Sequence, residues 1–153
     1  MASSVQAQGP ADQARAQPGR AGARRVALAG YRWLLLAFLL GCAAQIFLAG
    51  LGVFSFGDQD AAGGTSAFNA HMTLGFALAG VAVILLILAL IGRPGVLAMS
   101  LAGVLVIQTC LLQSLLDSLA DGTAAFGGLH ALDGLLIVAN AGVLYALALR
   151  RRR

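Results

Sequence analysis

Four long apolar runs constrain this chain more than any other feature of its sequence. They cover approximately residues 31–54, 68–92, 94–120 and 128–149. A helix of about 20 residues crosses the ~30 Å of hydrocarbon in a bilayer, so each run is long enough to span it. Transmembrane strands need only about 10 residues and alternate polar with apolar side chains, a pattern that these runs lack. The sequence therefore predicts an all-α membrane protein with four transmembrane helices.

The composition agrees with this class and excludes others. Hydrophobic residues make up 59% of the chain, charged residues 10%, and the mean hydropathy is +0.87, whereas a soluble domain carries about 25% charged residues. The net charge of +4 does not indicate a nucleic-acid partner, because a DNA-binding face needs a soluble fold to carry it. The chain has no phosphate-binding loop, metalloprotease helix, serine elbow or dinucleotide fingerprint. We expect a protein whose partner is the lipid bilayer, and we do not expect an enzyme.

The N-terminal segment differs from the rest of the chain. Residues 1–25 are rich in Ala, Gly, Gln and Arg and contain almost nothing apolar to bury. Such a segment cannot offset the entropy lost on ordering. The sequence predicts a disordered cytoplasmic tail over 1–25 and a four-helix transmembrane domain over 26–153.

The arginines predict how the domain is oriented. The chain has no lysine, and all ten arginines fall on one side of the four-span topology. They are Arg15, Arg20, Arg24, Arg25, Arg32, Arg93, Arg150, Arg151, Arg152 and Arg153. Asp58, Asp60 and Asp121 fall on the other side. Because basic residues near span ends stay in the cytoplasm, we expect a multi-pass protein of the cell membrane with both termini cytoplasmic.

The connections between the runs are short. Gly92-Arg93-Pro94-Gly95 predicts a tight turn in which Pro94 opens the third helix. Residues 55–67 and 121–127 are rich in Gly, Asp, Ser and Thr, as loops are. Short connections make successive helices antiparallel neighbours. The predicted fold is a four-helix up-down-up-down transmembrane bundle.

Polar residues inside the spans gather in the outer half of the bilayer, and the two histidines of the chain are among them. Counted from the arginines at the cytoplasmic side, His71 and His130 both lie ~30 Å up their helices, within about 3 Å of each other in depth. The second and fourth helices are diagonal partners in such a bundle, so the two imidazoles can face each other across its centre. A b-type haem takes one axial nitrogen from each side of its iron in this way.

Each histidine is followed four residues later by a glycine, at Gly75 and Gly134. Position i+4 lies on the same helix face one turn deeper, where a glycine leaves room for a flat macrocycle. Small residues at this spacing are also ordinary packing devices between membrane helices. We expect a surrounding shell of polar side chains, of which Asp133 lies three residues after His130 and can hydrogen-bond an imidazole. The members of this shell are Gln45, Gln113, Asp117 and Asp133.

The first and third helices contain a second repeat. Cys42-Ala-Ala-Gln45 matches Cys110-Leu-Leu-Gln113 and uses the only two cysteines of the chain. Together with the histidine pair, this suggests a duplicated helical hairpin. The depths of the two glutamines agree only if the first helix starts near Arg25.

The second and fourth helices, with His71 and Gly75 on one and His130 on the other, resemble one half of a haem A synthase. In that family each four-helix half holds a haem between histidines on its second and fourth helices. Phe68 stands where the catalytic half has a glutamate, and Met72 where an arginine often follows the histidine. The resemblance thus implies haem ligation and not haem oxidation. The whole chain is also similar to an uncharacterised family of small four-span bacterial membrane proteins.

Other interpretations of the same residues stay open. The polar residues can form a haem-free cluster, as in a membrane subunit or a small transporter-like protein. His71 and His130 alone supply too few ligands for a closed zinc site. Asp117 and Asp133 can relay protons or simply face water near the interface. Leu39-Leu40-Gly41-Cys42 partly resembles a lipobox, which would make Cys42 a lipidated N-terminus. With a haem, the expected role is electron transfer or haem handling for a respiratory or other membrane partner.

Overall fold

The computed structural model describes residues 17–57, 60–120 and 123–150. These residues form α2 (Gln17–Gly57), α3 (Ala61–Gly92), α4 (Val96–Val106), the π-helix η1 (Ile107–Leu112), α5 (Gln113–Ala120) and α6 (Ala124–Arg150). Four segments are long and apolar enough to cross a membrane, namely Ala21–Ser55, Ala61–Gly92, Val96–Leu119 and Ala124–Arg150. The prediction of an all-α protein with four candidate membrane spans is confirmed.

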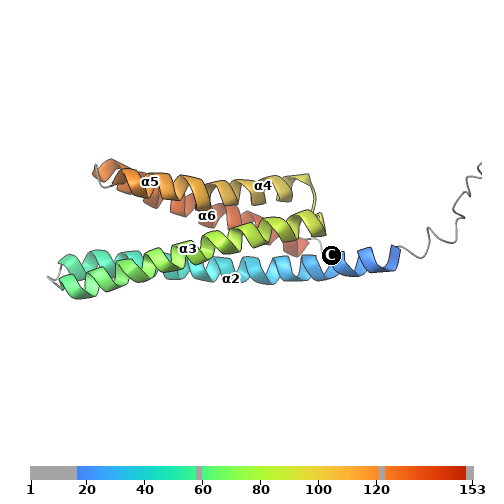
Figure 1. The fold of residues 1–153 in the computed structure, drawn as a ribbon, viewed down its shortest axis with the longest axis horizontal. Coiled ribbons are helices and arrows are strands. Elements are labelled where there is room, and N and C mark those ends of the chain that lie inside the picture. The colour runs from blue at the N-terminus through green and yellow to red at the C-terminus, as the bar shows by residue number, and fades with distance from the viewer. Residues whose placement is uncertain (1–16, 58–59, 121–122, 151–153) are drawn as a thin grey trace, which may run out of the picture.

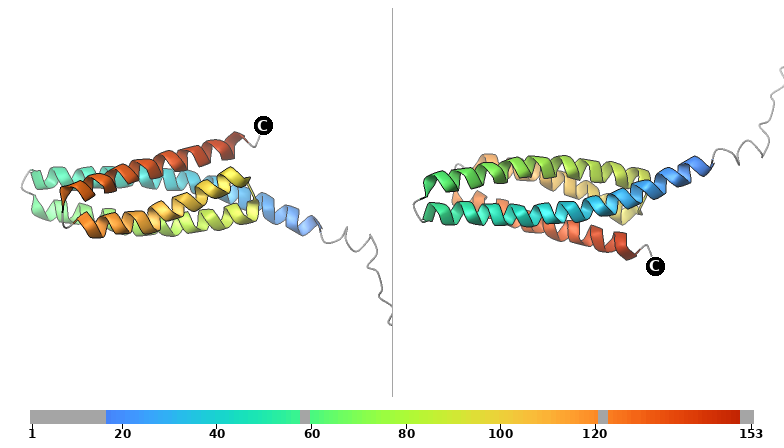
Figure 2. Two further views of the ribbon diagram at one scale, coloured as in Figure 1. Left: turned by 90° about the horizontal axis from the view of Figure 1, so that it is seen from above. Right: turned by 90° about the horizontal axis from the view of Figure 1, so that it is seen from below.

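The helices form two antiparallel hairpins that pack side by side (Figures 1 and 2). The first hairpin is α2 with α3, and the second is α4, η1 and α5 with α6. Between the hairpins, α3 packs on α4 and α2 packs on α6, whereas no Cα of α3 lies within 8 Å of a Cα of α6. Thus α3 and α6 are diagonal partners, as an up-down-up-down bundle requires.

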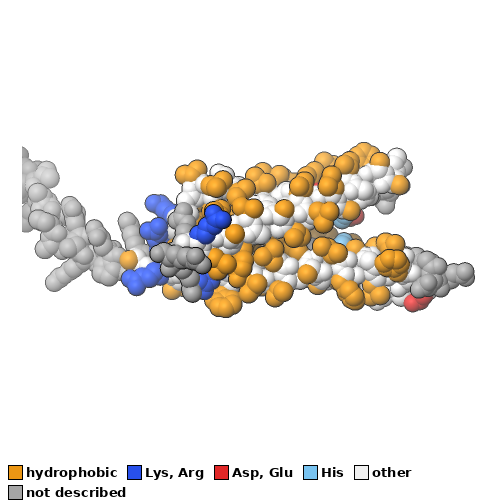
Figure 3. Space-filling model, turned by 180° about the vertical axis from the view of Figure 1, so that it is seen from behind, with side chains coloured by type: hydrophobic (Ala, Val, Ile, Leu, Met, Phe, Trp, Pro, Cys, Tyr) orange, Lys and Arg blue, Asp and Glu red, His pale blue; other side chains and the backbone are white. Residues whose placement is uncertain are grey.

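One end of the bundle carries Arg24, Arg25, Arg32, Arg93 and Arg150, and we call it the arginine end. The opposite end, toward which the histidines lie, is the histidine end. The space-filling view shows basic side chains only at the first of these (Figure 3). Both the start of α2 and the end of α6 lie at the arginine end (Figure 1).

The first helix starts earlier than the sequence predicts. It begins at Gln17, so residues 17–25 are helical, and the expectation of a disordered tail over 1–25 is wrong for that part. Ala, Arg and Gln are good helix formers, and Pro18 is tolerated because it lies in the first turn. Residues 1–16 lie outside the described residues.

The turn between the hairpins is tight, as expected, but Pro94 does not open the third helix. Arg93 adopts the left-handed conformation (φ 47°), and its backbone N–H donates to the Ala89 carbonyl to close α3. Gly95 follows with φ 105°, a region that favours glycine. Gly95 is the N-cap of α4, so the helix starts at Val96, and Pro94 is buried in the turn.

From the level of the histidines toward the arginine end the interior is closely packed, apart from a small cavity at that end. Six large side chains are 0–1% exposed there: Tyr31, Leu35, Phe38, Leu85, Leu105 and Leu144. They come from all four spans, and small residues such as Ala82, Ala102 and Ala141, all 0% exposed, let the helices approach. Large apolar side chains, including Trp33 and Phe47, remain on the outer surface, where a bilayer would cover them.

The third span is not a regular α-helix. Its hydrogen bonding widens to π-type over Ile107–Leu112, and such insertions occur frequently at functional sites. Beyond η1, α5 packs only on η1 and α6 and makes no backbone approach to α2 or α3. The hairpins therefore separate toward the histidine end, as Figure 1 shows.

Candidate functional site

The two histidines face each other between the hairpins. His71 lies on α3 and His130 on α6, and both are partly buried. Their ring centroids are 6.3 Å apart, and the ring planes are inclined by 49°. The sequence-based expectation that both rings point inward from diagonal helices is met by this geometry.

A cleft of about 840 Å³ surrounds the histidine rings, and all four spans line it. Its walls are mostly apolar, with side chains such as Phe38, Met72 and Phe76. Polar side chains line it as well: Gln45, Asn69, His71, Thr109, Gln113, Ser114, Asp117, Ser118 and His130. Figure 3 shows the cleft opening away from the arginines, with histidine and acidic side chains visible inside it.

One hydrogen bond orients the His71 ring, and another fixes the backbone at His130. His71 Nδ1 lies 3.1 Å from the Gln45 carbonyl oxygen, which can only accept, so Nδ1 carries the proton. The Nε2 of His71 therefore has its lone pair free to bind a ligand. On the other wall, Gln113 Nε2 donates to the His130 carbonyl at 3.1 Å. His130 Nδ1 is buried and has no partner among the described residues.

Gly75 and Gly134 both line the cleft, and each lies under a glutamine. A Cβ on Gly75 would lie 3.0 Å from Gln45 Nε2, and a Cβ on Gly134 would lie 3.8 Å from Gln113 Nε2. The glycines thus leave space that the ends of flexible glutamine side chains now occupy. A flat ligand could use that space only if the glutamines moved.

Asp133 does not hydrogen-bond an imidazole in this structure. It is 4% exposed, and its Oδ1 accepts from Gln108 Nε2 at 3.3 Å. Gln108 Oε1 in turn accepts from Asn140 Nδ2 at 3.1 Å, and Asn140 Nδ2 also donates to the Leu101 carbonyl. Asp133 therefore belongs to a polar chain between α6 and the third span, behind the wall of the cleft. Asp117, by contrast, is exposed and lines the cleft.

Sequence reasoning missed two contributors to this region. One is η1, whose Thr109 and Cys110 line the cleft. Cys110 Sγ donates to the Ala79 carbonyl at 3.7 Å, which links the π-helix to α3. The other is the Gln108–Asn140 pair, for which the spacing of Asp133 and Asn140 on one face of α6 is a weak sequence signal.

The two hairpins repeat one arrangement. In each, a glutamine that follows a cysteine by three residues is hydrogen-bonded to the histidine of the paired helix, but the bonds differ: the Gln45 backbone carbonyl accepts from the His71 ring, whereas the Gln113 side chain donates to the His130 carbonyl. The depth conflict seen in the sequence is resolved because Arg24 Nε donates to the Gly92 carbonyl at 3.0 Å. That contact sets Arg24, and not Arg32, level with the end of α3. Duplication of the hairpin stays a prediction that this likeness supports.

Neither a disulfide nor a larger metal-binding cluster is found in the described part of the chain. Cys42 and Cys110 are free thiols, and Cys42 is buried in the middle of α2. No group of three or more His, Cys, Asp or Glu side chains converges among residues 17–57, 60–120 and 123–150. The two histidines thus offer two nitrogen ligands to a metal bound between them.

Comparisons with models of known protein families, with curated proteins and with solved structures find no match to this chain. The likeness to one half of a haem A synthase, and to the small four-span bacterial family, therefore stays a prediction.

Proposed function

We propose that this chain binds one b-type haem between His71 and His130. The separation of the rings is the observation that carries the proposal. Metal–nitrogen bonds of about 2.0–2.1 Å, plus about 1.1 Å from each nitrogen to its ring centre, separate two axial imidazoles by ~6.3 Å. The observed centroid distance is 6.3 Å. Rotating one ring about the axis through the metal leaves this distance unchanged, so the 49° inclination is compatible with ligation.

The chemistry of the two side chains supports the same assignment. His71 donates its Nδ1 proton to a backbone carbonyl, an arrangement that fixes the tautomer and orientation of metal-bound histidines. His130 Nδ1 is a buried polar atom without a partner among the described residues, so no hydrogen bond there fixes the tautomer of His130, and its Nε2 can carry the lone pair that a metal needs.

The size and the lining of the cleft also support haem binding. Binding sites for cofactors occupy about 300–1,000 Å³ and are mostly apolar with a few polar groups, and this cleft measures about 840 Å³. Asn69, Ser114 and Ser118 line it and offer neutral hydrogen-bonding groups to an amphipathic ligand. Gly75 and Gly134 would admit the macrocycle once the Gln45 side chain swings aside and Gln113 shifts while keeping its bond to the His130 carbonyl.

A haem held by two histidines supplies one-electron transfer at a potential that the protein tunes. We therefore propose electron transfer or haem handling, for a respiratory or other membrane partner. By the charge rule we assign the arginine end to the cytoplasm and the histidine end to the outer face of the cell membrane. Within the chain, His71 and His130 would hold the iron, while Gln45 and Gln113 orient the segments that carry them.

The test is an absorption spectrum of protein purified in detergent from haem-replete cells, with and without dithionite. We expect the sharp bands of low-spin, six-coordinate haem in the reduced protein. His71→Ala and His130→Ala should each give five-coordinate iron that binds carbon monoxide, or no haem. Thr73→Ala and Leu132→Ala are matched controls, because these exposed residues lie on the same helices outside the cleft lining. A colourless parent protein, or a spectrum that ignores both histidine substitutions, rejects the proposal.

A second candidate is a haem-free polar cluster in a membrane subunit or small transporter-like protein. It is favoured by the contacts that the polar groups already make with one another, above all the Asp133–Gln108–Asn140 chain. Such contacts between membrane helices are worth about 0.6 kcal/mol each. In that case the histidine substitutions would leave a colourless protein with slightly altered stability.

A further inference from the structure

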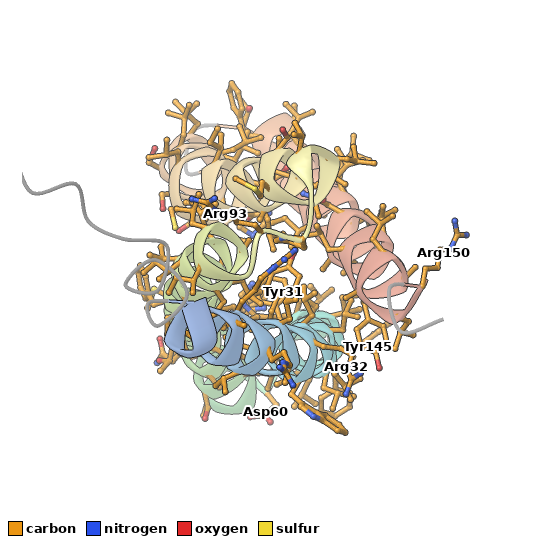
Figure 4. The ribbon with its side chains drawn as sticks, turned by 90° about the vertical axis from the view of Figure 1, so that its right-hand side faces the viewer. Tyr31, Arg32, Asp60, Arg93, Tyr145 and Arg150 are labelled. Atoms are coloured by element: carbon orange, nitrogen blue, oxygen red, sulfur yellow. The ribbon has the colours of Figure 1, made fainter. Side chains whose placement is uncertain are left out.

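A second and smaller cavity lies at the arginine end, remote from the histidines. It measures about 200 Å³ and lies where α2, the turn after α3 and the last residues of α6 meet. Its lining residues are Arg25, Leu28, Ala29, Tyr31, Arg32, Pro94 and Ala148. Figure 4 looks onto this end and shows Tyr31 between the helices, with Arg150 at the outer edge pointing away from the bundle.

The cavity contains an unused hydrogen-bonding group. Tyr31 is 1% exposed, yet its hydroxyl has no partner among the described residues. A buried hydroxyl without a partner costs free energy, so such groups usually bind a ligand or an ordered water. Tyr145, the other tyrosine, is only half-buried and does not line the cavity.

The cavity is also positively charged. Arg25 and Arg32 are seven residues apart on α2, on the same face as Leu28 and Ala29. The acidic residues that the structure describes, Asp60, Asp117 and Asp133, belong to the other half of the bundle. Arg24 already donates to the Gly92 carbonyl, and the Arg32 guanidinium lies 5.5 Å from the centre of the Trp33 ring.

We propose that this cavity binds the phosphate group of an anionic phospholipid. Basic cavities between transmembrane helices on the cytoplasmic side recognise such head groups. Arg25 and Arg32 would neutralise the phosphate, and the Tyr31 hydroxyl would donate to one of its oxygens. The acyl chains would continue along the exposed apolar surface of α2, where Trp33 is 64% exposed and belongs to the kind of aromatic belt that lies at the interface. The proposal does not depend on haem.

The experiment measures lipid retention by native mass spectrometry of the full chain in detergent. Three additives are compared, namely phosphatidylglycerol, phosphatidylcholine and inorganic phosphate. We expect saturable retention of one phosphatidylglycerol per chain and little retention of phosphatidylcholine. Inorganic phosphate that binds as tightly as the anionic lipid would overturn the lipid assignment, and so would equal retention of phosphatidylcholine.

Tyrosine variants, which leave the charge of the chain unchanged, distinguish binding in the cavity from a general attraction of the arginines to anionic lipid. Tyr31→Phe should weaken phosphatidylglycerol binding about ten-fold, the effect of one hydrogen bond to a charged group. Tyr145→Phe is the matched control and should bind like the parent. Arg25→Gln with Arg32→Gln should weaken binding by about five-fold for each arginine. If the arginine variants fail to insert, the tyrosine pair decides alone, and equal binding by Tyr31→Phe and Tyr145→Phe overturns the proposal.

Discussion

The two halves of this bundle are built from the same four helices but are packed in opposite ways. Toward the arginine end, Leu, Ile, Val and Ala dominate, and side chains that are 0–1% exposed fill the interior apart from a cavity of about 200 Å³. Toward the histidine end, the hairpins diverge around a cleft of about 840 Å³ lined by glutamines and histidines. Polar side chains in a membrane carry a free-energy cost, so they are retained mainly where they serve a function. The comparison indicates that the packed half holds the bundle together while the open half is available for binding.

The largest expected difference between the two ends is accessibility from outside the cell. In a variant without Cys42 and Cys110, cysteines introduced at Ser66 or Thr123 should react with an impermeant thiol reagent added outside. Cysteines at Ala14 or Arg152 should react only after the membrane is opened, if the proposed orientation holds and the arginine end faces the cytoplasm. Outside labelling at Arg152 would contradict the proposed orientation.

The packed half should be the more sensitive to loss of volume. Leu85→Ala removes a fully buried side chain and should lower the free energy of unfolding by about 2 kcal/mol or more, since a cavity remains even where lipid replaces water as solvent. Leu90→Ala, on the same helix but exposed, should change stability by less than about 0.5 kcal/mol. Unfolding in mixed detergent micelles measures both. Equal losses would mean that Leu85 does not contribute to a closed core.

The half with the cleft should be the more sensitive to added side-chain volume. We expect the effect on haem binding rather than on the stability of the bundle. Gly75→Leu would place its Cβ 3.0 Å from Gln45 Nε2 and extend further into the cleft. Overpacking of this kind costs about 1–3 kcal/mol, so haem occupancy should fall by about five-fold or more. Gly80→Leu has nothing within 4 Å of its Cβ and serves as the control. The haem-to-protein absorbance ratio gives the result, and unchanged occupancy in Gly75→Leu would separate the haem site from this glycine.

The smallest effect is expected at the polar chain behind the cleft. Asp133→Ala leaves the Gln108 amide without its acceptor and should cost about 0.6–1.7 kcal/mol of stability. Asp133→Asn keeps an acceptor and should cost less, and if haem is bound it should shift the midpoint potential without expelling the cofactor. Ser100→Ala, at an exposed position of the third span outside the cleft lining, is the control. Detergent unfolding and a potentiometric titration distinguish these outcomes.

Much of this arrangement could be predicted from the sequence, because membrane spans are long and their charges are segregated. The four spans, the hairpin pairing and the facing of His71 and His130 all follow from length, connection and depth along the helices. The start of α2 at Gln17 could not be read from hydrophobicity, because helix propensity and the Arg24 contact with the Gly92 carbonyl extend the helix through a polar segment.

The features that the sequence did not predict depend on the directions of side chains and on local helix geometry. The π-helix over Ile107–Leu112 changes the angular positions of the residues within and after it, so a regular helical projection misplaces Cys110 and Gln113 relative to the fourth span. Asp133 was expected to hydrogen-bond an imidazole because of its spacing from His130. Its partner is Gln108, since the buried Asp133 faces the third span. The π-helix has no signature in residue type, and the Asp133–Gln108 contact has only the weak signal of Asp133 and Asn140 on one face of α6.

The division of the histidines between two hairpins has a consequence for biogenesis. During synthesis the first hairpin enters the membrane with only His71, and the second imidazole arrives with the last helix of the chain. Because no Cα of α5 lies within 8 Å of a Cα of α2 or α3, a bridging ligand would add a connection between the hairpins at that end. If a haem is bound, it can be held by both histidines only after α6 has entered the membrane, so its presence would mark a chain in which the two hairpins have paired.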